Sequence, residues 1–384
     1  MDAYRVFFSL LASAIDGKAP DADIIGEITP EVLEKVYKLA RAHDFAHVIG
    51  KALEGNRLGH SEETVAKLAK HQMVSMYRYG QLEYELGRIC ETLEKFQIPF
   101  VALKGSVIRN YYPEAYMRTS CDIDILVHEE ELERAIDLLS RECSYRVEGE
   151  KGHHDISLFS ESGVHLELHF TICETRENLD RLLSCVWDHV SAKEGSCRYE
   201  MEKEFLVFHI IAHAADHFIS GGCGIKPVVD LWILNKYMEY DRELVAEYCR
   251  KCDLEKFYTS LLRLADIWFE DGEYDDVTAH MADYILGAGV YGKKENKIAL
   301  NQSRTGNKLV YLWKRIFIPY DELKYYYVKL QDHKWLLPYY EVKRWCRLVF
   351  GGGMKSSVKE IKMGVNMSDE KSDYVASLMD KLEL

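Results

Sequence analysis

The spacing of apolar residues divides the chain into three regions. Residues 1–97 carry apolar side chains at helical spacing, residues 98–200 mix alternating runs with helical ones, and residues 201–384 return to helical spacing. The last alternating runs of the middle region lie close enough together to form hairpins, which favours a mixed sheet over a fully parallel one. We therefore expect an α/β (α+β) fold, with a small mixed β-sheet core between an N-terminal and a C-terminal helical domain.

The middle region separates into individual elements. Alternation predicts strands at residues 99–104, 122–127, 144–149, 154–160 and 164–170. Helical spacing predicts helices at residues 105–111 and 129–141. Turns and glycine-rich breaks are expected at Gly149–Gly152, Ser160–Gly163, 220–224 and 287–292.

Two helices of the first region have recognisable ends. Thr29 and Pro30 are typical of an N-cap and a first helical turn, and a helical pattern follows them as far as Ala40. A longer pattern runs from His60 to Phe96. It stops before Pro99 because a proline disfavours helical backbone at the residue that precedes it.

Two carboxylates alternate along the predicted strand 122–127. Asp122 and Asp124 fall on one face of this strand, and the intervening isoleucines fall on the other. Two carboxylates held side by side repel each other unless positive charge lies between them. The Gly105-Ser106 turn opens a short helix nearby and offers backbone N–H groups to a phosphate. This pattern predicts a divalent cation beside a phosphate-binding turn.

A third acid lies on the predicted strand 164–170. Glu167 shares one face of that strand with His165 and His169. If the strand lies beside the aspartate strand, Glu167 joins the same site, and its oxygen-rich ligand set suits Mg²⁺ or Mn²⁺. His165 and His169 with Glu167 would also suit zinc in a hydrolase. We favour magnesium, with the histidines as hydrogen-bonded neighbours of the acids.

These residues resemble the signature of the DNA polymerase β-type nucleotidyltransferase superfamily, which has a Gly-Ser turn, an Asp-x-Asp strand and a later acidic residue. More narrowly, the chain resembles a bacterial family of nucleotidyltransferases that lacks an assigned substrate, over about residues 30–300. The narrower resemblance depends on Leu103-Lys104-Gly105, Arg118, Asp122–Val127, Glu167, His169, His213, His217 and Asp230.

The resemblance implies roles for these residues. Asp122, Asp124 and Glu167 would be the catalytic acids and the ligands of Mg²⁺ or Mn²⁺, and Gly105 and Ser106 would cradle the triphosphate. The further nucleotide-binding candidates are Lys104, Arg118 and Lys226, and the residues expected to line the cleft are His169, His213, His217 and Asp230.

Two of these assignments have alternatives. Arg118 would either clamp a phosphate or pair with an acid. His213 and His217 continue an i, i+4 series from His209, which is also typical of a packed polar helix face.

The expected reaction is metal-dependent transfer of a nucleoside monophosphate from an NTP, with ATP favoured, to a hydroxyl acceptor. Two metal ions would clamp the attacking and leaving oxygens, and pyrophosphate would be released. The acceptor would be a small molecule, a sugar or a protein. The alternative is a catalytically silent module that binds nucleotides with the same fold.

Composition narrows the partners. A formal net charge of −14 over 384 residues disfavours long nucleic acids, which require a basic surface. No apolar run is long enough to span a bilayer, so no membrane partner is expected. The ten cysteines lack the spacing of a disulfide framework, and Cys249-x-x-Cys252 has no second pair to complete a zinc site. We expect reduced thiols and a cytoplasmic location.

Overall fold

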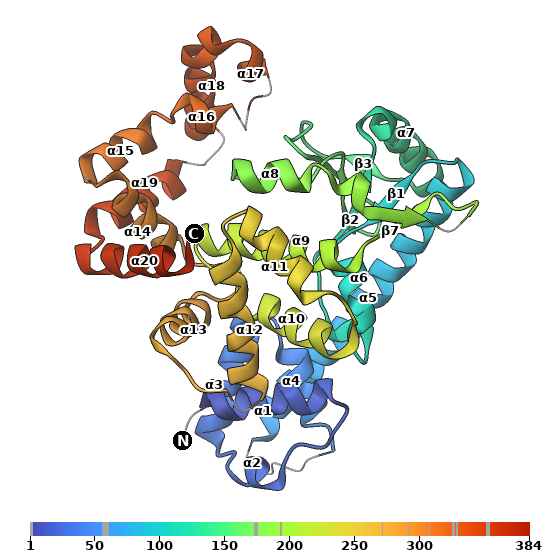
Figure 1. The fold of residues 1–384 in the computed structure, drawn as a ribbon, viewed down its shortest axis with the longest axis vertical. Coiled ribbons are helices and arrows are strands. Elements are labelled where there is room, and N and C mark those ends of the chain that lie inside the picture. The colour runs from blue at the N-terminus through green and yellow to red at the C-terminus, as the bar shows by residue number, and fades with distance from the viewer. Residues whose placement is uncertain are drawn as a thin grey trace.

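The protein folds as a set of helices around one mixed sheet (Figure 1). The computed structural model describes residues 3–55, 61–172, 176–192, 194–270, 272–290, 292–306, 308–324, 327, 329–350 and 354–384. His60, the first residue of the predicted long helix, lies outside this set. The expected α+β class is confirmed.

Seven strands form the sheet in the order β3-β4-β5-β2-β1-β7-β6. They are β1 (Phe100–Ala102), β2 (Asp122–Val127), β3 (Arg146–Val147), β4 (Asp155–Phe159), β5 (His165–His169), β6 (Val190–Ala192) and β7 (Arg198–Met201). β2 runs parallel to β5 and antiparallel to β1, while β1 runs parallel to β7. All five predicted strands are present, and β6 and β7 are additional.

One face of the sheet packs on two helices, α5 (Glu62–Lys95) and α7 (Leu132–Cys143). Alternation turns Ile123 and Ile125 of β2, and Leu166 and Leu168 of β5, into this buried cluster. The intervening polar residues must therefore lie on the opposite face. Burial of the apolar face thus fixes the direction in which the acids of β2 and β5 point.

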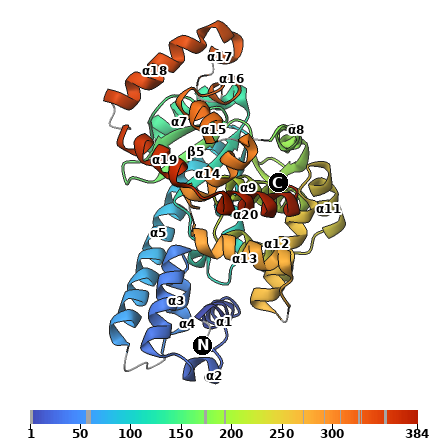
Figure 2. The ribbon, with the colours of Figure 1, turned by 90° about the vertical axis from the view of Figure 1, so that its left-hand side faces the viewer.

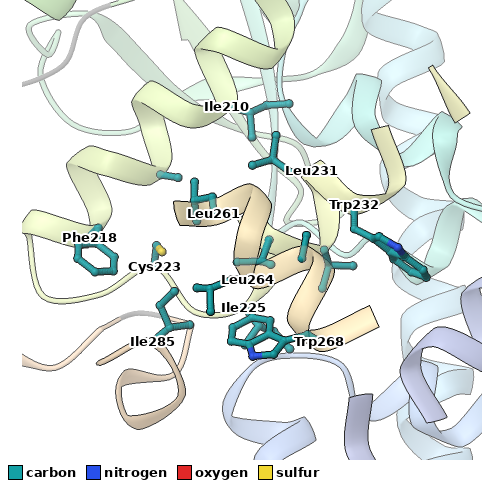
Figure 3. Packing of buried hydrophobic residues seen from close by; sticks show 14 of the residues in the cluster. Ile210, Phe218, Cys223, Ile225, Leu231, Trp232, Leu261, Leu264, Trp268 and Ile285 are labelled. Atoms are coloured by element: carbon teal, nitrogen blue, oxygen red, sulfur yellow. The ribbon is translucent and has the colours of Figure 1, made fainter. Parts of the chain in front are cut away.

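The N-terminal and C-terminal helices share a second hydrophobic cluster. It joins α1 (Ala3–Ile15), α3 (Pro30–Ala42) and α4 (Ala46–Ala52) to α9 (Lys203–Ile219), α10 (Lys226–Tyr237), α12 (Glu255–Phe269) and α13 (Asp276–Ala288). Phe8 stacks on Trp268 with ring centroids 4.5 Å apart. Trp268 packs among α9, α10, α12 and α13 in the same core (Figure 3). The two helical regions, although separated in sequence by the sheet, therefore form one core.

Local signals account for the helix ends. Thr29 Oγ1 accepts a hydrogen bond from the Val32 amide at 3.3 Å, and Pro30 opens α3, as predicted. The long helix α5 begins directly after Ser61 and ends at Lys95. It runs beside α3 and α4 at one end and under the sheet at the other (Figure 2). The predicted helix 105–111 is α6 (Gly105–Ile108) followed by a 3₁₀ turn.

The two predicted glycine breaks lie against each other. Gly221 has φ +129° and its carbonyl accepts a hydrogen bond from the Lys293 amide at 2.9 Å. A Cβ at Gly221 would lie 2.7 Å from Lys293 O, and one at Gly292 would lie 2.6 Å from the Gly221 carbonyl carbon. Only glycine permits this approach of two backbone segments.

The remaining helices complete the fold. They are α2 (Ala22–Gly26), α8 (Glu177–Leu183), α11 (Arg242–Lys251), α14 (Lys294–Thr305), α15 (Lys308–Ile316), α16 (Tyr320–Leu323), α17 (Lys329–Asp332), α18 (Leu337–Phe350), α19 (Met354–Asn366) and α20 (Asp369–Leu382). The α15–α18 group stands away from the sheet, while α20 returns to α12–α14 (Figure 1). Within the described ranges, no helix combines the length and the apolar character that crossing a bilayer requires.

Candidate active site

The register between β2 and β5 brings the three acids together. Asp124 lies opposite Glu167 in the parallel pair, and Asp122 lies opposite His165. One ligand atom each from Asp122, His165 and Glu167 fall within 4.8 Å of one another, and the same holds for Asp124, Glu167 and His169. The expectation that the two strands are neighbours is confirmed.

Asp124 has two cationic neighbours. Lys104 Nζ and His169 Nε2 both lie 3.0 Å from Asp124 Oδ1. Burial alone would raise the pKa of Asp124, but these hydrogen bonds and charges lower it far below the usual range. Lys104, which we expected to reach a phosphate, lies here because β1 pairs with β2 and the Leu103 amide donates to Asp124 O at 3.0 Å.

Asp122 carries charge that its surroundings do not neutralise. It forms no ion pair with any residue that the structure describes. Burial and the charges of Asp124 and Glu167 raise the pKa of Asp122. Excess negative charge on converging carboxylate oxygens is the environment that a hard divalent cation neutralises. The donor set of Asp122, Asp124 and Glu167 therefore fits Mg²⁺ or Mn²⁺.

His169 is held between two acids. Its Nε2 lies 3.0 Å from Asp124 and 3.5 Å from Glu167 Oε2. Burial lowers the pKa of His169, but the two hydrogen bonds to carboxylates outweigh this and raise it. A hydrogen bond from His169 in turn lowers the pKa of Glu167. His169 is therefore a hydrogen-bonded neighbour of Asp124 and Glu167.

The Gly105-Ser106 turn is tightly packed. A Cβ at Gly105 would lie 3.1 Å from Ser120 Cβ and 3.2 Å from Arg118 Nη1. The Ser106 amide donates to Leu103 O at 3.2 Å, so this N–H holds the turn itself. Ser106 Oγ is buried and has no hydrogen-bond partner among the described residues. The amide of Ser106 is thus used within the turn, while its hydroxyl is buried, and the phosphate contact of Ser106 stays a prediction.

A family model described as "Uncharacterised nucleotidyltransferase" matches residues 30–270. The chain belongs to this family. The matched part of the chain contains the whole sheet, both acidic strands and α9–α12, while α13–α20 lie beyond it. No curated protein and no solved structure matches the chain.

Arg118 pairs with an acid in the structure. Its Nε and Nη2 donate to Asp230 at 3.2 and 2.9 Å, and Tyr112 OH donates to the same carboxylate at 2.6 Å. Burial of Arg118 lowers its pKa, but Asp230 outweighs this and raises it. Of the two alternatives for Arg118, the structure shows the acid pair. Asp230 is its partner from α10, and the expected cleft position of Asp230 stays a prediction.

Lys226 also holds the segment before β2. Its Nζ donates to Thr119 O at 3.1 Å and to Thr119 Oγ1 at 3.2 Å, and lies 3.4 Å from Asp44. Thr119 in turn donates to Asp44 at 2.6 Å. α10 therefore holds residues 118 and 119, four and three positions before the first acid, through Asp230 and Lys226. The proposed nucleotide contact of Lys226 stays a prediction.

The histidines of α9 differ in their surroundings. His209 is buried, and neither ring nitrogen has a hydrogen-bond partner in the described part of the chain. His213 Nε2 lies 3.1 Å from His217 Nε2, and His217 is exposed. Burial, and next the charge of Lys104, depress the pKa of His209 and of His213. The charges of Lys104 and Asp124 thus act on both of these histidines of α9, and the cleft roles of His213 and His217 stay predictions.

One buried residue near the acids was missed in the sequence. Arg109 donates to Gly105 O at 2.8 Å and to Ser120 Oγ at 2.7 Å. Its place four residues after Gly105, one helical turn on, was the available signal. This spacing does not show whether an arginine is buried, so the position of Arg109 becomes evident only from the packing of the folded chain.

Proposed function

We propose that this nucleotidyltransferase moves a nucleoside monophosphate from an NTP, with ATP favoured, to a hydroxyl acceptor and releases pyrophosphate. One observation carries the proposal. Asp122, Asp124 and Glu167 lie on the same face of the neighbouring strands β2 and β5, beside the Gly105-Ser106 turn. An acidic cluster beside a serine hydroxyl without a partner suits a metal-bound polyphosphate.

Each acid has a role in this proposal. Asp122, Asp124 and Glu167 hold Mg²⁺ or Mn²⁺, which when bound neutralises phosphate charge and orients the reacting oxygens. Lys104 balances the charge of Asp124 and lies where it can exchange that carboxylate for a phosphate oxygen. In this proposal, the Ser106 hydroxyl donates a hydrogen bond to an oxygen of the pyrophosphate portion.

The transfer is an in-line displacement at the α-phosphorus. The acceptor oxygen forms the new P–O bond while the bond to the bridging oxygen of the pyrophosphate breaks. Glu167 takes the acceptor proton, since the hydrogen bond from His169 keeps this carboxylate ionised at neutral pH. The net charge of −14 favours a small molecule, a sugar or a protein as acceptor over a long nucleic acid.

Replacement of Asp122 tests the assignment. Asp122→Asn keeps the side-chain shape but removes the charge, and we expect turnover to fall about 1,000-fold or more. Asp122 is the cleanest target because, in the described structure, it forms no ion pair that its replacement would break. Pyrophosphate release is measured with each NTP, Mg²⁺ and a panel of hydroxyl acceptors. The matched control is Glu161→Gln, an exposed acid in the turn before β5. Wild-type turnover by Asp122→Asn would refute the proposal.

The second candidate function is a silent nucleotide-binding module. It is favoured by one observation, the ion pair of Lys104 with Asp124, which neutralises an acid without a metal. Calorimetry with each NTP and Mg²⁺, followed by pyrophosphate assays, separates the two functions. Tight binding without release under every condition would support the module.

A further inference from the structure

A cavity of about 300 Å³ lies at the start of β2, outside the three acids. Its walls come from α5 and from the segment that leads into β2, and Cys121 of this wall directly precedes Asp122. Three of the lining residues are arginines, Arg78, Arg109 and Arg118. A volume of this size accommodates a small ligand.

Arg109 is the central observation. Arg109 is 2% exposed, and within the described part of the chain its guanidinium donates to two uncharged oxygens, Gly105 O and Ser120 Oγ. It makes no ion pair with any residue in the described ranges. A buried guanidinium without a carboxylate is costly, so its retention here indicates a negatively charged partner.

The other charges around the cavity are largely cancelled in pairs. Arg118 is neutralised by Asp230, and Asp44 lies 3.4 Å from Lys226. His47, whose Nε2 bonds Met117 O, is kept neutral at pH 7 because burial lowers its pKa to about 4. Arg78 is exposed on α5 and forms no ion pair with the described residues. Arg78 and Arg109 are left as two cations without a carboxylate in ion-pair contact among the described residues, and Glu83 and Asp122 act on Arg109 only from further away.

We propose that this cavity binds a phosphate group of a reactant through Arg78 and Arg109. The identity of the reactant rests on the function proposed above, since the cavity adjoins Asp122. The phosphate belongs either to the nucleotide or to a phosphorylated acceptor. Tyr79, whose ring lies 5.8 Å from the Arg109 guanidinium carbon, and buried Tyr116 provide apolar walls for the part of the reactant that carries the phosphate.

The test uses the full chain without added metal, so that the acids do not contribute. Calorimetry measures the affinity for inorganic phosphate and for tripolyphosphate. Arg78→Gln should weaken phosphate binding about fivefold, because one exposed charge-assisted contact is lost. Lys70→Gln, which removes an exposed charge from the same helix outside the cavity, should leave it unchanged. Arg109→Gln should weaken it further, with circular dichroism to check folding.

Competition distinguishes the two sources of the phosphate. If ATP displaces inorganic phosphate and loses affinity in Arg78→Gln, the site holds the nucleotide. If ATP and phosphate bind together, the site holds the acceptor. Equal phosphate affinity of wild type and Arg78→Gln, or no phosphate binding at millimolar concentration, would overturn the proposal. Asp122→Asn should keep the phosphate affinity of the wild type. Loss of turnover in this variant therefore tests the proposed transfer reaction, and phosphate affinity tests the cavity.

Discussion

At the scale of single residues, Asp230 is held by several hydrogen bonds to its carboxylate. Its carboxylate accepts two from Arg118 and one from Tyr112, and it is 2% exposed. A buried pair of this kind is a strong constraint on position, because removal of either charge leaves the other without compensation. The pair therefore fixes the start of β2 relative to α10.

Asp230→Asn should lower the free energy of unfolding by about 3–5 kcal/mol, because Arg118 would remain buried without its counter-charge. Tyr112→Phe removes one hydrogen bond from the same carboxylate and should cost about 1 kcal/mol. Urea unfolding monitored by circular dichroism measures both. If Asp230→Asn kept wild-type stability and lost only activity, Asp230 would instead be a substrate contact.

The partners of individual side chains are what the sequence could not predict. Alternation identified the face that carries Asp122, Asp124 and Glu167, since a strand has only two faces. The partner of Lys104 depends on the β1–β2 register, and that of Arg118 on a helix more than one hundred residues later. The burial of Arg109 depends on the packing of α5. None of these is encoded in local spacing.

At the scale of elements, strong periodicity and turn residues in the sequence were sufficient to predict the strands that carry the acids. β2 was predicted with its observed bounds, and β5 lies within its predicted range, because both alternate cleanly over a buried face. β6 and β7 were not predicted as strands. They are three and four residues long, and no residue in either strand is buried, so no apolar alternation marks them.

The contact between the two glycine breaks gives a prediction at this scale. Gly221→Ala should destabilise the protein by about 2–4 kcal/mol, because alanine is strained at φ +129° and its Cβ would meet Lys293 O at 2.7 Å. Thermal unfolding measures the change. Gly87→Ala in α5 is the matched control. A Cβ there meets nothing within 4 Å, and the substitution should stabilise by about 0.5–1 kcal/mol. Equal effects of the two variants would contradict this account.

At the scale of the whole molecule, the first and last helical regions meet through a buried histidine. His43 Nε2 lies 3.2 Å from Leu286 O, and Val290 N–H donates to Ala42 O at 2.9 Å. The division into domains 1–97, 98–200 and 201–384 stays a prediction. The shared core shows that helices of the first and third segments pack together, which no local pattern in the sequence reveals.

Stability should therefore depend on pH through His43. Burial lowers the pKa of His43 to about 4, partly opposed by the bond to Leu286 O, whereas an unfolded histidine titrates near 6.5. Between these values the unfolded chain binds more protons, so the free energy of unfolding falls as pH drops from 6.5 towards 4. His43 alone should contribute about 2 kcal/mol between pH 6.5 and 4.5.

His43→Gln isolates this contribution. Glutamine retains a donor for Leu286 O but does not titrate, so the difference in stability between wild type and variant should shrink as the pH falls. Denaturant unfolding at several pH values between 7.5 and 4.5 gives the comparison. Parallel curves for the two proteins would show that His43 does not titrate on unfolding.

The long helix α5 has a mechanical consequence. Its 34 residues span about 50 Å at 1.5 Å per residue, and one stiff rod thereby reaches from the α3–α4 bundle to the underside of the sheet. Arg78 and Tyr79 stand near its midpoint. The cavity that Arg78 and Tyr79 line therefore borders the segment of α5 that joins the two hydrophobic cores, and a ligand bound there would contact both residues of that junction.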